Sequence, residues 1–572
     1  MKADKTLLFL AAAALAAHFV AARAFIRSAA PTYDETVHLA RGYSILATGR
    51  YDMVPTGHPP LAEIAGALPL LALRPGAFVG HPYFIGNMAY HYGDLFLYDN
   101  VVPPERLLGA ARGFSLLLWS GLTAFFIWLF AGRSHGPSVA AASVAVFSLM
   151  PVFISNNALV ATDAASSALY LGAFCLAYMF SSMPAAPKPP RSAWSRKRLI
   201  LAALAGLLSG LAMAAKFNMF VVPPLVLSLW TADNLMERRV RPAALAGYAA
   251  LYLVCALFAA AAVYGFDLAP YASGLRDMFG MLDRGRSSFA WGHYGLEGVW
   301  WYFPLALAVK TPLAALALAL AGAVSMARSF RKEYIWLLVP PLVYFIAASA
   351  SKMQIGFRHV MPALTFMAIL AGIGTVSVAR SRALLAAAAP LLLLWGWGLV
   401  RTWPHYLAYF NELAGGPANG YKFLVDSNLD WGQDVKALAD RLAGMGNPPV
   451  VFSYFGVARP ERYGIRYVPL GVVSNVELRG TGEDLCRAEE LLLAVSATNL
   501  QGTYYPDRDT YGWLKERKPG FSAGYSIFLY DLSADRDGTS RLAGLFDRNG
   551  MNEEAECLYA RLDKGGAAKA GK

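Results

Sequence analysis

Charged residues are scarce in this chain. Asp, Glu, Lys and Arg make up 15% of its 572 residues, against about 25% in ordinary soluble domains. Hydrophobic residues make up 56%, and the mean hydropathy is +0.40. Apolar runs of roughly 18 residues or more, which can cross the hydrocarbon of a bilayer as helices, recur over residues 1–400. This composition excludes an ordinary soluble protein and predicts a polytopic α-helical membrane protein.

Cysteine is also scarce, and compact metal-binding motifs are absent. The four cysteines form no CxxC pair, and no HExxH motif occurs. Cys175 and Cys255 lie in apolar runs and are predicted to be packing residues. Cys486 and Cys557 lie in the tail, where an oxidising compartment would allow a disulfide. Sequence alone does not give their separation, so the pairing stays open.

The formal net charge is +12, which by itself would suit a nucleic-acid partner. The basic residues are instead scattered in short loops between apolar runs, and membrane orientation explains them better. We therefore predict contact with membrane lipid and no nucleic-acid partner. Positive-inside bias places four loops in the cytoplasm: 188–198, 233–242, 328–333 and 380–382.

The apolar runs predict about eleven transmembrane helices. The first run has a basic start, as signal peptides do, but it is long and lacks a clear cleavage site, so we predict a retained helix. With a cytoplasmic N-terminus, eleven spans put the four basic loops on one side. No internal repeat is visible, which weakens the case for an inverted-repeat transporter. The predicted spans are 6–27, 107–131, 137–155, 162–180, 199–216, 218–230, 242–266, 298–324, 335–349, 360–378 and 384–401.

Two domains are predicted. Residues 1–401 form a transmembrane catalytic domain that includes the outer loop 28–106 with its amphipathic helices, and residues 402–572 form a soluble α/β domain outside the membrane. The tail is richer in Asp, Glu, Asn and Gly and holds no further run of membrane length. Its segments "PPVVFSYFG" and "ELLLAVSAT" are predicted to be buried strands, and "DVKALADRLAGMG" is predicted to be a helix that ends at glycine.

The first outer loop carries the most polar stretch in the first third of the chain, "PTYDETVHLARGY". It predicts an amphipathic helix whose first turn holds Asp34 and Glu35. Val37 and Leu39 are expected to face the membrane. Asp34 and His38 are four residues apart, so a helix makes them neighbours. An acid at a helix start can equally be a simple N-cap on a solvated face, and this alternative stays open.

Other polar residues reach the same membrane face from distant parts of the chain. His58, in "GHPPL", is either a site residue or part of a turn that the prolines fix. Asp163 lies at the outer end of the fourth span, where an ionisable group is either a helix cap or functional. Lys216, Arg358 and His359 lie at outer ends of later spans. These cations suit an anionic ligand, and snorkelling to lipid headgroups is the alternative.

Together these residues supply carboxylates, imidazoles and cations in an aqueous site beside lipid. A carboxylate can deprotonate an acceptor hydroxyl, while Lys and Arg can neutralise the charge on a departing phosphate. Transfer chemistry on a lipid-linked phosphate is therefore the favoured prediction. The alternative is a transporter or flippase of a lipid-linked saccharide, which predicts charges near the bilayer midplane and breaks in paired helices. A non-catalytic receptor or scaffold is a third hypothesis.

Several motifs resemble a known family. The "DE" pair in the first outer loop, the following His and "HPPL" before an amphipathic helix resemble the protein O-mannosyltransferase-like branch of the GT-C glycosyltransferases, glycosyltransferase family 39. The aminoarabinose transferase of lipid A is a more distant relative. "SKMQIGFRHVMPAL" and "PHYLAYFNELAGGPANGYKFLVDSNLDWGQDV" are similar to stretches of bacterial membrane glycosyltransferases of this group. The chain lacks the large luminal insert of the eukaryotic mannosyltransferases and carries a C-terminal outer domain instead.

The resemblance implies a GT-C fold and an inverting transferase. Its donor would be a hexosyl or pentosyl group on undecaprenyl or another polyprenyl phosphate, and its acceptor a hydroxyl of a protein, lipid or glycan at the periplasmic face of a bacterial inner membrane. Asp34 is then expected to be the general base, Glu35 and His58 to shape the site or hold a cation, and Asp163 to be a second outer-face acid. With His38, these residues could hold a divalent cation, but their spacing is not a metal motif, so metal dependence stays open.

Two further roles are carried over from position and charge. Lys216 and Arg358 are expected to bind the donor phosphate. His293 lies in a later outer loop beside Trp291 and Tyr294, whose aromatic faces could stack on a sugar. An interfacial aromatic belt is the alternative explanation for that loop.

Overall fold

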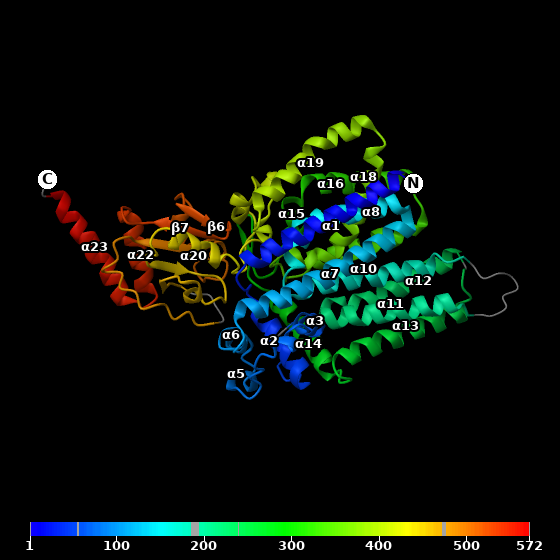
Figure 1. The fold of residues 1–572 in the computed structure, drawn as a ribbon, viewed down its shortest axis with the longest axis horizontal. Helices are drawn as coiled ribbons and strands as arrows, with labels where there is room; N and C mark the ends of the chain where they lie inside the picture. The colour runs from blue at the N-terminus through cyan, green and yellow to red at the C-terminus, as the bar shows by residue number, and fades with distance from the viewer. Residues whose placement is uncertain (1, 54–56, 185–193, 238, 472–475, 571–572) are drawn as a thin grey trace.

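A computed structural model describes residues 2–53, 57–184, 194–237, 239–471 and 476–570. Two parts are visible in Figure 1: a bundle of long helices, and a smaller α/β part at one end of the bundle. The N-terminus lies at the opposite end of the bundle from the α/β part, and the C-terminus lies beyond the α/β part (Figure 1). The predicted fold class, a polytopic helical membrane protein with a C-terminal α/β domain, is confirmed.

Eight helices within the described ranges are long and apolar enough to cross a membrane. A ninth candidate is the pair α15 (Tyr302–Lys310) and α16 (Leu313–Arg328). Two shorter apolar helices, α8 (Pro137–Leu149) and α17 (Ile335–Ser349), complete the bundle. The eight are α1 (Lys2–Ser28), α7 (Pro104–His135), α10 (Thr162–Ser181), α11 (Arg196–Ala215), η1 with α12 (Phe217–Val221 and Val222–Glu237), α13 (Pro242–Val263), η3 with α18 (Phe357–Val360 and Met361–Ala379) and α19 (Arg382–Thr402).

Two predicted spans are not single helices. The segment 298–324 is broken between α15 and α16, whose axes differ by 111°. Pro312 precedes α16 and lacks the amide proton that a continuous helix would use, so the helix cannot run straight through. The segment 137–155 is likewise divided, because α8 stops before Pro151 and α9 (Pro151–Asn156) restarts the helix.

The bundle has a buried centre and a lipid-facing rim. In α10, 89% of the membrane-length window is buried inside the protein, against 11% in α19. Small residues permit close packing between α11 and α13: an added Cβ at Gly206 would lie 2.2 Å from the Tyr252 carbonyl oxygen, and one at Gly210 would lie 2.0 Å from that of Ala256. Glycine at these positions lets the two backbones approach as closely as membrane helices often do.

Short helices cover the end of the bundle that faces the α/β part (Figure 1). The N-terminal half of the predicted amphipathic helix does not face the membrane, because Val37 and Leu39 are 4% and 0% exposed and pack inside the protein. The following apolar stretch is also divided, at Pro69, into two short helices. These covering elements are α2 (Glu35–Thr48), α3 (Leu61–Ala67), α4 (Leu70–Leu73), α5 (Pro82–Ile85), α6 (Ala89–Tyr98), α14 (Ala269–Arg284) and the hairpin of β1 (Ser288–Ala290) and β2 (His293–Gly295).

A mixed five-stranded sheet forms the centre of the α/β part. Its strand order is β4-β3-β5-β7-β6, with β3 parallel to β4 and β5, and β7 antiparallel to β5 and β6. Both predicted strands and the predicted helix are present, as β3, β5 and α20. The elements are α20 (Val435–Ala443), β3 (Val450–Ser453), β4 (Tyr467–Pro469), β5 (Leu492–Ser496), α21 (Ala497–Leu500), β6 (Phe521–Ala523), β7 (Ile527–Asp531), α22 (Arg536–Arg548) and α23 (Asn552–Ala570).

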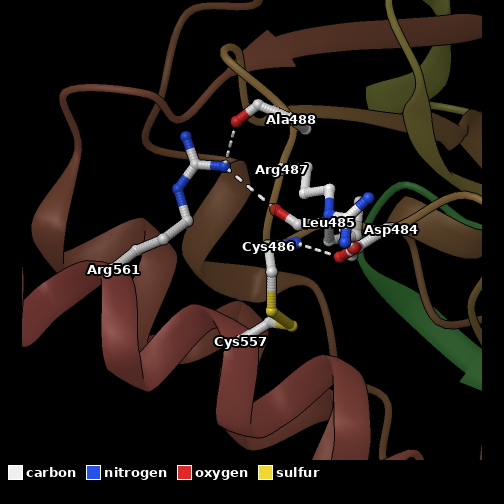
Figure 2. The surroundings of a disulfide bond; sticks show 7 residues. All are labelled: Asp484, Leu485, Cys486, Arg487, Ala488, Cys557 and Arg561. Atoms are coloured by element: carbon white, nitrogen blue, oxygen red, sulfur yellow. Dashed lines mark hydrogen bonds and ion pairs between the residues drawn. A yellow bond between two sulfur atoms is a disulfide. The ribbon is translucent and has the colours of Figure 1, made fainter.

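A disulfide and an ion-pair cluster fix the α/β part. Cys486 and Cys557 form a disulfide that ties α23 to the loop after β4, and Arg561 donates hydrogen bonds to carbonyl oxygens of the same loop (Figure 2). Arg459 forms ion pairs of 2.6 Å with Asp94, on α6, and of 2.9 Å with Asp99. The chain that links α19 to α20 also packs against the bundle, since the Trp431 carbonyl accepts from the Tyr33 amide. The boundary proposed at residues 401 and 402 stays a prediction.

Candidate functional site

Asp34 lies at the N-terminal end of α2, in the position that precedes its first turn. Its carboxylate is 19% exposed and has two direct partners. Oδ1 accepts a hydrogen bond of 3.3 Å from the Tyr90 hydroxyl, and Oδ2 lies 3.5 Å from Arg358 Nη2. Both contacts are long, so the carboxylate is held in place while part of it stays open to solvent. The Asp34 side chain makes no cap hydrogen bond to the helix, so its placement is not that of a simple N-cap.

Glu35 points the other way and is fully buried. Arg112 on α7 donates two hydrogen bonds to its carboxylate, of 2.9 and 2.6 Å. The Glu35 carboxylate also accepts hydrogen bonds from the amide and the hydroxyl of Thr32 and from the Val160 amide. Glu35 therefore anchors α2 to the bundle rather than facing the solvent beside Asp34.

His38 and His58 lie beside Asp34. The His38 ring is oriented by Glu63, whose carboxylate oxygen is 2.8 Å from Nδ1, and Arg41 holds the other oxygen of Glu63 at 2.7 Å. The ring centroids of His38 and His58 are 4.8 Å apart in an edge-to-face arrangement. One potential ligand atom from each of Asp34, His38 and His58 lies within 4.8 Å of the others, so these three residues could hold a divalent cation. The Glu63 contact resembles the outer-shell carboxylates that orient metal-ligating histidines.

Asp163 joins the two predicted cations. Its carboxylate lies 2.5 Å from Lys216 Nζ and 2.9 Å from Arg358 Nη1, and all three side chains are nearly inaccessible to solvent. Arg358 also donates to the Ser427 hydroxyl at 3.0 Å and lies 4.0 Å above the Trp431 ring. Arg358 thus bridges the two predicted acids, Asp34 and Asp163, whereas Lys216 is paired with Asp163.

The remaining predicted site residues are His359 and His293. His359 follows Arg358, and its Nε2 atom is buried with no hydrogen-bond partner among the described residues. His293 is exposed on β2, with its ring 6.0 Å from that of Trp301. The structure places no contact between His293 and the cluster around Asp34 in the part of the chain that it describes.

Three residues that the sequence analysis did not single out complete the cluster. The Arg286 side chain, in the loop after α14, donates to the Tyr504 hydroxyl at 3.2 Å. Tyr504 in turn donates to Asp426, whose backbone is left-handed with φ of 56°. Asp426 lies in the "VDSNLDWGQDV" motif, but Arg286 and Tyr504 come from segments 218 residues apart. No local pattern pairs them.

The electrostatics at the N-terminal end of α2 favour an ionised Asp34. Burial opposes ionisation, but the charges of the Arg358 guanidinium and the His38 ring outweigh it and lower the pKa of Asp34. Burial beside His38 lowers the pKa of His58 to about 3, so His58 is neutral at pH 7. Burial also disfavours the charged form of His38, but the hydrogen bond and charge of Glu63 raise its pKa overall. The cluster therefore presents an anionic carboxylate beside one neutral imidazole.

Fold and site together define a membrane protein with a polar, partly open cluster at the end of its helical bundle that carries the α/β part. No protein-family model and no curated protein sequence matches the chain. Among solved structures, the chain is similar to ArnT from Cupriavidus metallidurans in the apo state, with 13% identity, coverage of 93% of this chain and 99% of that chain, and a TM-score of 0.49. ArnT bound to undecaprenyl phosphate matches over the same shares with 13% identity and a TM-score of 0.46.

A more distant match is the archaeal oligosaccharyltransferase AglB from Archaeoglobus fulgidus, in complex with an inhibitory peptide and a dolichol-phosphate. It shares 11% identity over 67% of this chain and 54% of that chain, with a TM-score of 0.41. ArnT and AglB are both members of the GT-C fold. At such low identity the matches concern the path of the chain, and functional roles must rest on the residues of the site.

Proposed function

We propose that the protein is a membrane-bound glycosyltransferase that moves a sugar from a polyprenyl-phosphate donor to a hydroxyl acceptor. In this proposal Asp34 is the general base. The sugar is a hexosyl or pentosyl group, the donor lipid is undecaprenyl phosphate, and the acceptor is a protein, lipid or glycan. The protein belongs to the bacterial inner membrane, with the site on the periplasmic side.

The observation that carries the proposal is the environment of the Asp34 carboxylate. It is ionised, 19% exposed and held, among the described residues, by two long contacts of 3.3 and 3.5 Å. Glu35 and Asp163, by contrast, are buried, and cations of the protein bind their carboxylates: Arg112 binds Glu35, and Lys216 and Arg358 bind Asp163. Among the acids of this cluster, Asp34 is thus the one with capacity left to accept a proton from a substrate.

The bond changes follow from that role. Asp34 accepts the proton of the acceptor hydroxyl, whose oxygen forms a bond to the anomeric carbon of the donor sugar. The bond from that carbon to the phosphate oxygen breaks, and its electron pair leaves with the phosphate. Cations near the departing oxygen stabilise the charge that develops there. Attack on the face opposite the phosphate inverts the anomeric centre.

Among the cations of the cluster, Arg286 is best suited to meet the departing phosphate. Its guanidinium has no carboxylate oxygen within 4.0 Å in the described residues, and its side chain is exposed. Lys216 and Arg358 are both committed to Asp163. We therefore assign phosphate binding first to Arg286, with Arg358 in support. In this arrangement Lys216 positions Asp163, and Glu35 positions the helix that carries Asp34.

Two further features support the assigned location. The disulfide between Cys486 and Cys557 suits an oxidising compartment, and the α/β part that contains it lies at the same end as the cluster. The N-terminus lies at the other end (Figure 1). Basic loops at that end would favour the cytoplasm.

Proteoliposomes with labelled undecaprenyl-phosphate sugars test the proposal. A panel of hexose and pentose donors is incubated with the purified protein and with envelope extract from a deletion strain as the acceptor source. Asp34→Asn is expected to lower the transfer rate by a factor of about 10² to 10⁴. Asp52→Asn is a matched control, because Asp52 lies in the same outer loop but is exposed and paired with Arg50.

Equal transfer by wild type and Asp34→Asn contradicts the assignment of the base. Labelled lipid that crosses the bilayer without any transfer supports the flippase alternative and overturns the proposed function. Mass spectrometry of envelope glycans and glycoproteins from the deletion strain should reveal one missing sugar, which would identify the group that is transferred.

A further inference from the structure

A cleft of about 530 Å³ lies between the β1–β2 hairpin and the α/β part. Its volume is in the range of ordinary ligand sites, roughly 300–1,000 Å³. The hairpin contributes aromatic side chains, the chain before the sheet contributes Tyr421 and Lys422, and the α/β part contributes residues 501–515. Its lining thus comes from three separate segments, and none of the residues proposed for catalysis lines it.

Trp291, which lines the cleft, has an unusual backbone conformation. The pairing of Ala290 with His293 leaves a two-residue turn, and both residues of the turn, Trp291 and Gly292, have positive φ of 44° and 81°. Asn-Gly is the usual choice for such a turn, and a bulky residue with positive φ is strained. The Trp291 side chain is 66% exposed, although it stacks on Phe423. Strained backbone that displays an exposed aromatic ring is typical of functional positions.

The cleft is also rich in cations. Lys422, Arg508 and Lys515 line it together with one acid, Asp509. In the described ranges, none of the three cations has a carboxylate oxygen within 4.0 Å. Arg508 is fixed in place, because it donates to the Gly502 and Thr503 carbonyl oxygens and lies 5.7 Å from the Tyr294 ring. Cations that are positioned but unpaired are suited to an anionic ligand.

One turn of the α/β part connects this cleft to the Asp34 cluster. The Thr503 carbonyl accepts from Arg508 on the cleft side and from the Ser287 hydroxyl. The next residue, Tyr504, bonds to Arg286 and Asp426 in the cluster. A ligand in the cleft therefore lies one turn away from residues that surround the proposed base.

We infer that this cleft binds the acceptor, and that the acceptor is an acidic saccharide. A sugar ring stacks on Trp291, and its carboxylate or phosphate lies among Lys422, Arg508 and Lys515. The aromatic rings stack on the sugar ring, whereas the cations bind its acidic group and so favour acidic over neutral saccharides. The binding of an acidic saccharide is inferred from the residues of the cleft alone. The role of that saccharide as the acceptor rests on the proposed function.

The test measures binding to the full-length protein in lipid nanodiscs by calorimetry. The probes are hexagalacturonate, a phosphorylated mannohexaose and neutral mannohexaose. At least one acidic probe should bind about tenfold more tightly than the neutral one, and the preference should fall as salt rises. The tighter of the two acidic probes identifies the acidic group as carboxylate or phosphate. Equal binding of all three probes, or binding of none, overturns the inference.

Matched variants locate the binding. Trp291→Ala should weaken every probe by about tenfold, whereas Trp300→Ala, at an exposed tryptophan outside the cleft lining, should not. The double variant Lys422→Gln with Lys515→Gln should lose the preference for acidic probes, and Lys518→Gln should keep it. Wild-type binding by Trp291→Ala and by the double lysine variant overturns the inference.

The outcome is separable from that of the proposed function. Asp34→Asn should bind the probes as the wild type does while losing transfer. Binding in the cleft with no transfer activity in the wild type would refute the proposed function and leave the saccharide site intact. Conversely, a working transferase whose Trp291→Ala variant keeps the wild-type KM for its acceptor would refute the acceptor role of the cleft.

Discussion

The adjacent acids Asp34 and Glu35 should behave oppositely when each is replaced by its amide. Glu35 is fully buried and accepts five hydrogen bonds: two from Arg112, two from Thr32 and one from the Val160 amide. Glu35→Gln removes the negative charge and replaces one acceptor oxygen with a donor group. The Arg112 guanidinium then stays buried with only the Ala29, Ala30 and Ile26 carbonyl oxygens and one amide oxygen as partners.

The expected loss of folding free energy follows from the uncompensated charge on Arg112. Removing one partner of a buried ion pair typically destabilises a protein by about 3–5 kcal/mol. Arg112→Met should cost a similar amount, because it leaves the Glu35 carboxylate buried. The double variant Glu35→Met with Arg112→Met should cost clearly less than the sum, since neither charge is then stranded. Asp34→Asn loses two long contacts of a partly exposed group and should cost about 1 kcal/mol or less.

The pH dependence of stability gives an independent check. Burial opposes ionisation of Glu35, but the charge and hydrogen bonds of Arg112 outweigh it and lower the pKa. A depressed carboxyl pKa stabilises the folded state above the unfolded value, and this stabilisation is lost as the pH falls through the folded value. The difference between wild type and Glu35→Gln should therefore be largest near neutral pH and shrink in acid.

Unfolding in mixed micelles by SDS titration, followed by circular dichroism, measures these free energies. Transfer activity is assayed in the same preparations. A loss of less than about 1 kcal/mol in Glu35→Gln, or a loss in Asp34→Asn as large as that in Glu35→Gln, refutes the division of roles. So does a strictly additive double variant.

Three further predictions concern the outer segments. His405 lies 2.7 Å from Asp434, whose charge outweighs burial and raises the pKa of His405. The stabilisation that protonated His405 provides is complete below about pH 6.5 and fades as the pH rises. His405→Gln should therefore lower the thermal midpoint more at pH 5.5 than at pH 9. Burial raises the pKa of Asp430 to about 8, which penalises folding increasingly as the pH rises towards that value; Asp430→Asn should thus raise the thermal midpoint relative to wild type more at pH 9 than at pH 5. Cys557→Ser, which opens the disulfide with Cys486, should destabilise the α/β part by about 2–4 kcal/mol in urea unfolding, and dithiothreitol should then have no further effect.

Much of the architecture is predictable from sequence because it depends on local properties. The length of an apolar run decides whether a helix can cross a bilayer, and the predicted spans coincide with apolar helices, except that 298–324 is the bent pair α15 and α16 and 137–155 is divided into α8 and α9. Apolar strand segments and a glycine-terminated helix likewise predict β3, β5 and α20. The bend between α15 and α16 was missed because the apolar composition continues across Pro312.

The polar residues of the cluster around Asp34 were predicted for a similar reason. Ionisable groups are costly near lipid, so an isolated Asp, Lys or Arg at the end of an apolar run attracts attention whatever its partners. That argument singles out Asp34, Asp163, Lys216 and Arg358, and the structure brings these four together. His293 was predicted for another reason, its position beside Trp291 and Tyr294, and it lies outside this cluster.

The sequence by itself determined that the chain enters a membrane, where its helices run and which face collects its polar residues, since these depend on composition along the chain. Tertiary structure alone decided which of two adjacent acids is partly open to solvent. Successive helical residues point in directions about 100° apart, so Glu35 meets Arg112 while Asp34 meets Tyr90 and Arg358. It also decided that Arg286 and Tyr504 join the cluster, because a contact between segments so far apart depends on how the whole chain packs.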